Sequence, residues 1–159
     1  TKTLPAAAPL PQALQAAVGE LAHQMPAIDQ PRHRHGLRAV VSRCVALARH
    51  PAAAPDIDPE LAHAVNTATL AAARLSHLDR NLAEIDLAQP SDETRAMLHE
   101  RDTWAARLLD LTATLDGFYA RLSGAQAQKM AAESMLKSSE DPLAELRLRV
   151  ESLEEIQGL

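Results

Sequence analysis

The chain has 159 residues, and 47% of them are hydrophobic but only 2% are aromatic, so alanine and leucine, two strong helix formers, supply most of its apolar side chains. No apolar run is long enough to span a bilayer, and the single cysteine, Cys44, excludes an internal disulfide, so we expect a cytoplasmic protein. The net charge of −5 is uneven, because residues 1–50 carry a surplus of four positive charges and residues 51–159 a surplus of nine negative charges.

The first part of the chain is expected to form a tail and two helices. Residues 1–11 contain three prolines among alanines, which is typical of a disordered or polyproline-like tail. A first helix is expected over residues 11–25 and a second over residues 37–49, because apolar residues recur in both at spacings of three and four. Two prolines and a glycine indicate that residues 26–36 connect the two helices.

The strongest helical pattern of the sequence covers residues 58–88 and 91–122. Asp58 precedes Pro59, so we expect Asp58 to cap the first of these two long helices. Ser91 is expected to cap the second, which has acidic residues in its first turn, where the helix dipole favours them. Two long helices joined by so short a break should fold back on each other as an antiparallel hairpin.

The apolar stripes of the two long helices predict how they pair. With the turn centred on Pro90, the register places Leu75 opposite Trp104, and small residues of the first helix face large residues of the second. The same register places Arg101, a charged residue in the second stripe, near Asp79 of the first helix. We therefore predict an ion pair between these two side chains.

The chain after residue 122 has a weaker pattern. The second long helix either ends at Ser123-Gly124 or continues to about residue 137, because its heptad pattern persists with few apolar residues. Asp141-Pro142 is a second helix start signal and predicts a last helix to about residue 157. A helix this short must pack on the rest of the protein or on another chain. Its apolar stripe is a candidate oligomer contact, made of Leu143, Leu146, Val150 and Leu153.

These elements together predict an all-α protein. We expect a helical bundle around a long antiparallel, coiled-coil-like hairpin, with two shorter N-terminal helices and a C-terminal helix. The predicted organisation is a Pro/Ala tail over residues 1–11, a helical bundle over residues 12–124 and a C-terminal helical arm over residues 125–159.

The most conspicuous polar cluster lies just before the second predicted helix and extends into it. Guanidinium and imidazole groups near a helix N-terminus are suited to hold a phosphate or a carboxylate. The alternative, which we favour, is that these side chains pair with the acidic hairpin within one fold. The candidate anion-binding residues are Arg32, His33, Arg34, His35, Arg38 and Arg43.

The sequence contains no motif that indicates catalysis or a cofactor. His33 and His35 are suitably spaced for chelation, but a metal site needs further ligands, and neither an HExxH nor a Cys-x-x-Cys motif is present. Cys44 lies on the apolar stripe of the second predicted helix, where we expect a buried structural thiol. We therefore expect no catalytic residue, no metal and no cofactor.

Two classes of function remain compatible with these features. The first is a non-enzymatic protein–protein interaction or scaffold protein that acts through helix packing and self-associates, with a homodimer expected. The alternative is a nucleic-acid or polyanion-binding module that uses the basic residues 32–49. The scarcity of aromatic residues disfavours binding to single-stranded nucleic acid, because no stacking platform accompanies the charge.

Overall fold

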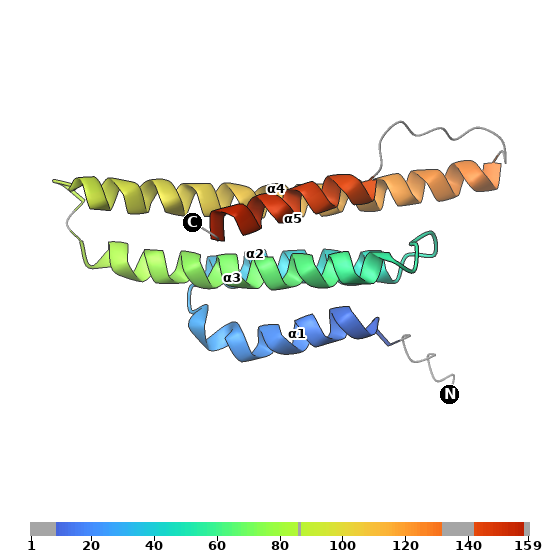
Figure 1. Cartoon of the computed structure of the whole chain (residues 1–159), viewed down its shortest axis with the longest axis horizontal. Coiled ribbons are helices and arrows are strands. Elements are labelled where there is room, and N and C mark those ends of the chain that lie inside the picture. Colours follow the sequence, from blue (N-terminus) through green and yellow to red (C-terminus); the bar gives the residue numbers. More distant parts are fainter. Residues whose placement is uncertain (1–8, 86, 132–141, 158–159) are drawn as a thin grey trace.

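The computed structural model of the chain describes residues 9–85, 87–131 and 142–157. Within these ranges the chain forms five α-helices and one short 3-10 helix, with no strand, so the prediction of an all-α helical bundle is confirmed. The α-helices are α1 (Gln12–Gln24), α2 (Pro31–Ala48), α3 (Ile57–Ala83), α4 (Asp92–Ala131) and α5 (Pro142–Gln157), and the 3-10 helix η1 (Met25–Ala27) follows α1 (Figure 1).

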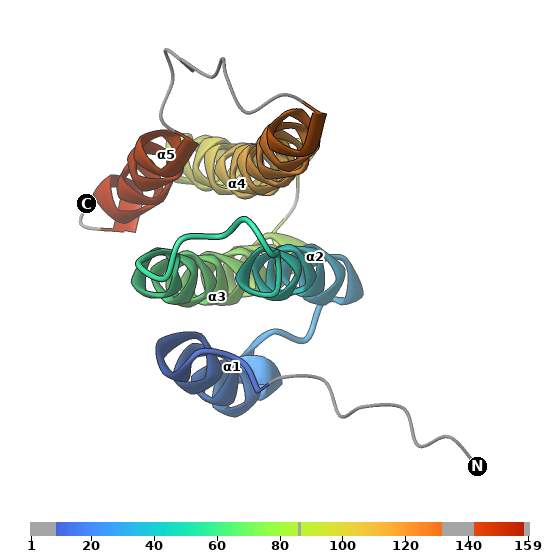
Figure 2. The ribbon, with the colours of Figure 1, turned by 90° about the vertical axis from the view of Figure 1, so that its right-hand side faces the viewer.

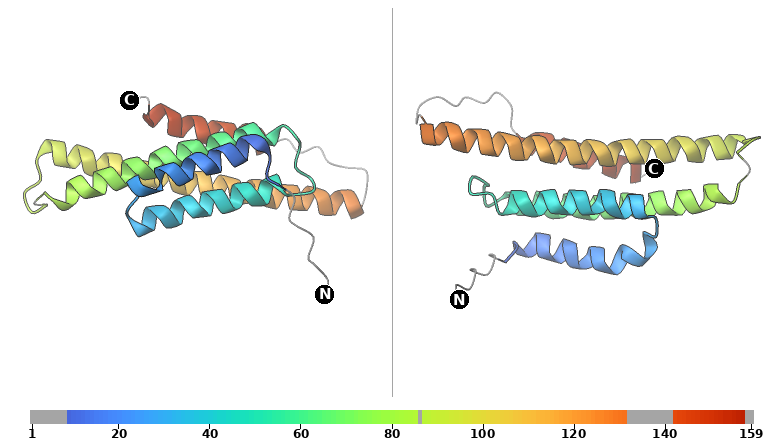
Figure 3. Two further views of the ribbon diagram at one scale, coloured as in Figure 1. Left: turned by 90° about the horizontal axis from the view of Figure 1, so that it is seen from below. Right: turned by 180° about the vertical axis from the view of Figure 1, so that it is seen from behind.

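The helices form three layers around α3. Viewed end-on, α2 and α3 lie side by side in the middle layer, with α1 on one side and α4 and α5 on the other (Figure 2). Seen from below, α1 lies along α3 (Figure 3), and α3 contacts each of the other four helices. A helix covered on several sides needs small side chains if its neighbours are to approach closely. The buried alanines of α3 are accordingly Ala62, Ala64, Ala68, Ala71 and Ala72.

The relation between α3 and α4 is more complex than a simple two-helix seam. The two helices run in opposite directions on either side of the break near Pro90 (Figure 1). However, both α2 and α5 pack against both α3 and α4, so large residues of α4 have more than one neighbour. Leu108, for example, lies against α2, where a Cβ at Gly36 would be 3.7 Å from its Cδ2. The coiled-coil-like register, including Leu75 opposite Trp104, therefore remains a prediction.

The apolar stripe of α5 is buried within the chain itself. Leu146, Val150 and Leu153 belong to the same core as the large side chains of α3 and α4, and Leu143 packs against this core. Three of the four residues proposed as an oligomer contact are therefore buried against the chain's own helices, and Leu143 is partly buried. The physical reason is that α3 and α4 leave an apolar groove along which α5 packs.

Ion pairs flank the buried stripe of α5. Arg147 of α5 donates to Glu60 of α3 over 2.8 Å. Such exposed pairs each contribute little to stability, so the apolar stripe supplies most of the free energy that holds α5 in place. Three further pairs that involve α5 are Arg121–Glu145, His63–Glu154 and Arg149–Asp110.

Asp58 does not cap its own helix, so this prediction is wrong. The helix α3 begins one residue earlier, at Ile57, and the Asp58 carboxylate accepts hydrogen bonds from the backbone N–H groups of Ala13 (3.1 Å) and Leu14 (2.9 Å). These are free donors in the first turn of α1, whose preceding residue, Pro11, has no side-chain acceptor. Asp58 therefore attaches the start of α1 to the start of α3.

We expect replacement of Asp58 with alanine to lower the free energy of unfolding by about 1–2 kcal/mol, because α1 loses its capping acceptor. Asp56→Ala is the matched control, since Asp56 precedes α3 without a side-chain capping bond and should change stability by less than about 0.5 kcal/mol. Urea unfolding followed by circular dichroism measures both values. Equal losses for the two variants would contradict the capping role of Asp58.

The predicted connector over residues 26–36 is also wrong in its second half, because α2 already begins at Pro31. Proline is favourable at the first helical position, and Gly36 is accommodated inside the helix.

The predicted cap at Ser91 is confirmed by a hydrogen bond of 3.2 Å from the Thr94 N–H to the Ser91 Oγ. The helix α4 continues through Gly124 to Ala131, so the boundary predicted between residues 124 and 125 lies inside a helix. Residues 1–8 of the predicted tail lie outside the described residues.

Candidate functional site

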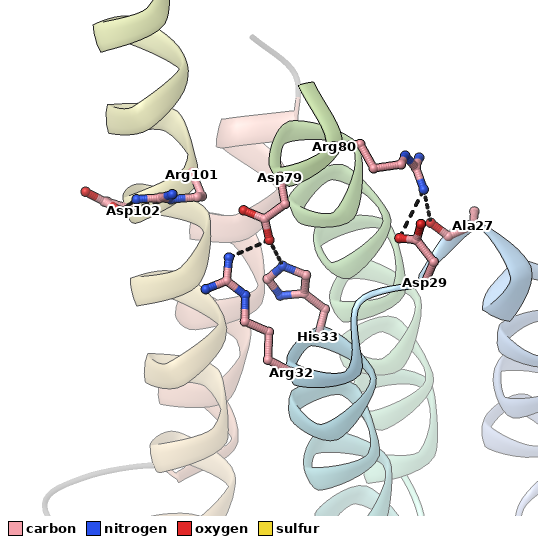
Figure 4. A network of polar contacts seen from close by, with 8 residues as sticks. All are labelled: Ala27, Asp29, Arg32, His33, Asp79, Arg80, Arg101 and Asp102. Atoms are coloured by element: carbon pink, nitrogen blue, oxygen red, sulfur yellow. Dashed lines mark hydrogen bonds and ion pairs between the residues drawn. The ribbon is translucent and has the colours of Figure 1, made fainter. Parts of the chain in front are cut away.

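A buried carboxylate joins α2 to α3 near one end of the bundle. Asp79 of α3 accepts hydrogen bonds from Arg32 Nη2 and His33 Nε2, both at 2.5 Å, and both donors come from the first turn of α2 (Figure 4). The side chains of Asp79 and His33 are only 9% and 7% exposed, whereas that of Arg32 is 63% exposed. Asp79 therefore has a largely buried charge whose partners approach from one side.

The electrostatics of Asp79 reflect two opposing effects. Burial alone would raise the pKa of this carboxyl, because it disfavours the charged form. The hydrogen bonds and positive charges of Arg32 and His33 outweigh burial and lower the pKa of Asp79 below its ordinary value. The carboxylate is thus ionised at neutral pH and stabilises the contact between α2 and α3.

The predicted ion pair between Arg101 and Asp79 is not formed. Arg101 instead donates to its sequence neighbour Asp102, from Nη2 over 3.3 Å and from Nε over 3.4 Å (Figure 4). The prediction considered only the two long helices. In the structure α2 supplies Arg32 and His33, and these two side chains occupy the Asp79 carboxylate. Arg101 is left with a weak, exposed partner.

A second polar contact fixes the connector before α2. Arg80, next to Asp79 on α3, forms an ion pair of 3.1 Å with Asp29 and donates to the carbonyl oxygen of Ala27 over 3.4 Å (Figure 4). Two successive residues of α3 therefore hold the first turn of α2 and the connector that precedes it. This arrangement sets the position at which α2 begins.

The remaining residues of the predicted anion-binding set have varied surroundings. Arg34 donates to backbone carbonyl oxygens of the connector, including that of Met25 at 3.3 Å. Arg43 forms an ion pair of 2.6 Å with Asp116 of α4, which together with Arg32–Asp79 follows the internal pairing that we favoured. His35 and Arg38 are exposed on α2.

The positive surface of α2 is consequently narrower than the sequence suggests. Among the described residues, Arg38 of α2 and Arg49, which follows the last turn of α2, are exposed arginines without an ion-pair partner. Polyanion binding depends on several phosphate contacts made together, and each engaged arginine must give up a partner to make one. The structure therefore brings the predicted residues to α2 but not into one continuous basic face.

Two of the hollows beside α4 combine apolar and charged side chains, and no sequence pattern predicted either of them. The first, which we name the α2–α4 cavity, has a volume of about 330 Å³ and lies among the start of α2, Leu75 of α3 and residues 101–112 of α4. The second, which we name the Trp104 groove, has a volume of about 720 Å³ and lies between α3 and α4 at the end of α5. The residues of the Trp104 groove used below are Leu70, Arg74, Glu100, Thr103, Trp104 and Ile156.

The Trp104 groove combines an apolar floor with an ion pair. Trp104 is buried, and its Nε1 donates to Glu100 over 3.3 Å. Arg74 of α3 binds the same carboxylate through two hydrogen bonds of 2.8 and 3.1 Å. The hydrogen bond from Arg74 is the main reason that the pKa of Glu100 is lowered. Leu70, at the rim, is 53% exposed.

Two potentially nucleophilic side chains, those of Cys44 and Ser76, are buried. Cys44 is fully buried, as predicted, and burial raises the pKa of its thiol to about 12, so it is not a nucleophile in the folded protein. No group of three or more His, Cys, Asp or Glu side chains in the described ranges is arranged to hold a metal ion. Ser76 has a buried hydroxyl without a hydrogen-bond partner.

None of the described helices has the length and apolar character needed to cross a bilayer. No protein-family model matches the chain, and neither curated proteins nor solved structures show a match to it. A function must therefore be inferred from the two hollows and the charges around them.

Proposed function

We propose that the protein is a non-enzymatic interaction or scaffold protein that acts through helix packing and self-associates through the Trp104 groove. One observation carries this proposal. The groove between α3 and α4 that α5 occupies along its length continues as an open hollow beyond Ile156. An apolar groove between two helices commonly binds a further helix, and α5 already binds along this groove.

Both long helices continue past the end of α5. From Leu70 to Ala83 on α3, and from Asp92 to Trp104 on α4, each helix extends by about 20 Å at 1.5 Å per residue. These stretches project beyond the end of α5 (Figure 1). In this proposal they act as a coiled-coil-like hairpin, and the hairpins of two copies pack together as a four-helix bundle.

The charges of the groove favour a second copy of the chain as its occupant. A two-fold dimer brings a surface against itself, so the surface must be self-complementary. The Trp104 groove carries one guanidinium, Arg74, and one carboxylate, Glu100, beside its apolar floor. In a symmetric dimer each charge can approach its opposite on the partner, whereas a face of one sign would repel its copy.

The test is the effect of Leu70→Asp on the mass in solution. Wild-type protein should sediment as a dimer of the 17.1 kDa chain, and Leu70→Asp should give the monomer mass because a charge at the rim opposes apolar contact. Leu70 is half exposed, so the variant should keep its fold, which circular dichroism checks. Sedimentation velocity over a range of concentrations measures the mass.

Leu148→Asp is the matched control for this experiment. Leu148 is 65% exposed on α5 and lines neither hollow, so the same substitution there should leave the dimer intact. A wild-type chain that is monomeric at every concentration would overturn the proposal. So would a folded Leu70→Asp variant that retains the wild-type mass.

A further inference from the structure

The α2–α4 cavity has the size and shape of a small-molecule site. Its volume of about 330 Å³ lies at the lower end of the range found for ligand pockets, about 300–1,000 Å³. Its apolar wall comes from two helices, with Leu75 on α3 and Ala105 and Leu108 on α4. Leu75 and Leu108 are themselves buried, so their positions are fixed by the core.

Gly36 of α2 lines this cavity. The residue lies inside α2 with an ordinary backbone conformation, so the backbone itself does not require glycine. A Cβ at this position would make only an ordinary contact of 3.7 Å with Leu108 Cδ2, so alanine would fit. A larger side chain would instead extend into the space in front of Leu108. Glycine inside a helix is about 1 kcal/mol less favourable than alanine, and at this position it leaves the space in front of Leu108 unfilled.

Two guanidinium groups line the polar side of the cavity. Arg32 is 63% exposed and uses one of its donors for Asp79, while Arg101 is 31% exposed and makes only long contacts to Asp102. Asp102 also lines the cavity, but its side chain is 72% exposed and can be displaced by a stronger partner. The Asp79 carboxylate is already bound by Arg32 and His33, so Arg101 is the guanidinium of the cavity with the weaker partner. The start of α2 adds the favourable dipole of a helix N-terminus.

From this arrangement we propose that the α2–α4 cavity binds a small monocarboxylate with an aliphatic tail. The carboxylate accepts hydrogen bonds from Arg32 and Arg101, a geometry for which guanidinium groups are well suited. The tail lies against Leu75, Ala105 and Leu108. Inorganic phosphate would leave this apolar wall uncovered, and a neutral molecule would make no use of the arginines. The proposal is independent of self-association, because the Trp104 groove shares no lining residue with this cavity.

The probe for this proposal is octanoate, titrated into the full chain by isothermal titration calorimetry. We expect saturable binding with one site per chain, and octanamide, which has the same tail without the charge, should bind at least about tenfold more weakly. Arg101→Gln should weaken octanoate binding by about tenfold or more, because it removes a charged donor that makes only the weak Asp102 contact in the fold.

Three further variants complete the design. Arg107→Gln makes the same change on the same helix but outside the cavity, so octanoate affinity should not change. Gly36→Leu should abolish binding by filling the hollow, and Gly36→Ala controls for the added methyl group. Should Gly36→Leu fail to fold, Arg101→Gln still decides the matter. Absence of saturable octanoate binding, equal affinity for octanamide, or an unchanged affinity in Arg101→Gln would each overturn the proposal.

Discussion

Replacement of both Leu146 and Leu153 with aspartate should detach α5 and destabilise the whole bundle. Both side chains are fully buried between α5 and the α3–α4 groove. Loss of a buried leucine costs about 2–5 kcal/mol, so the pair should lower the free energy of unfolding by about 4–10 kcal/mol. An unpaired carboxylate at each position adds a further desolvation cost. A loss of this size approaches the entire stability of a typical domain.

Urea unfolding followed by circular dichroism measures this effect, and Leu148→Asp is the control. Leu148 lies on the same helix but is 65% exposed, so the substitution should change stability by less than about 0.5 kcal/mol. If the stripe were instead a contact between chains, the double variant would remain a folded monomer with the helical signal of the wild type. An unfolding curve like that of the wild type would contradict the position of α5.

The number and order of the helices could be predicted because local signals determine them. Proline breaks and apolar periodicity separated the segments, and the cap at Ser91 and the start at Pro142 agree with the structure. The errors concern what glycine and proline do at helix starts. Pro31 and Gly36 suggested a connector, but proline at a first helical position and glycine within a helix are both compatible with α2.

The arrangement of the helices was harder to predict because it depends on which faces are covered. The predicted register depends on one stripe of small residues along α3 and therefore indicates one main partner. Ala62 and Ala72 lie on another side of the same helix and are also buried. Small residues on several faces indicate a central helix with several neighbours, and this signal was present in the sequence.

The sequence indicated which charged regions would attract each other, but not which residues would form each ion pair. The basic beginning of the chain does pair with acidic residues of the long helices, as Arg32–Asp79 and Arg43–Asp116 demonstrate. The particular partners lie on different helices and far apart in sequence, so helical spacing carries no information about them. The same reason explains why Asp58 was assigned to its own helix rather than to α1. Both hollows depend on such long-range packing and were therefore missed.

Replacement of Asp79 with alanine should lower the free energy of unfolding by about 2–3 kcal/mol at neutral pH. Removal of one partner from a buried charge pair costs about 3–5 kcal/mol, and the exposure of Arg32 reduces this figure. His33, which is buried, would lose its acceptor. Urea unfolding at pH 7 measures the difference. Asp116→Ala is the matched control, because the Arg43–Asp116 pair is much more exposed and should contribute less than about 1 kcal/mol.

The contribution of Asp79 to the free energy of unfolding should decrease as the pH falls. The pKa of Asp79 is lower in the folded chain than its ordinary value, so the unfolded chain takes up this proton first as the pH falls. The stabilisation by Asp79 is therefore complete above the ordinary carboxyl pKa of about 4 and is lost progressively below it. The stability difference between wild type and Asp79→Ala should accordingly shrink between pH 5 and pH 2. A difference that stays constant, or that grows on acidification through this range, would show that the Asp79 carboxylate does not hold α2 against α3.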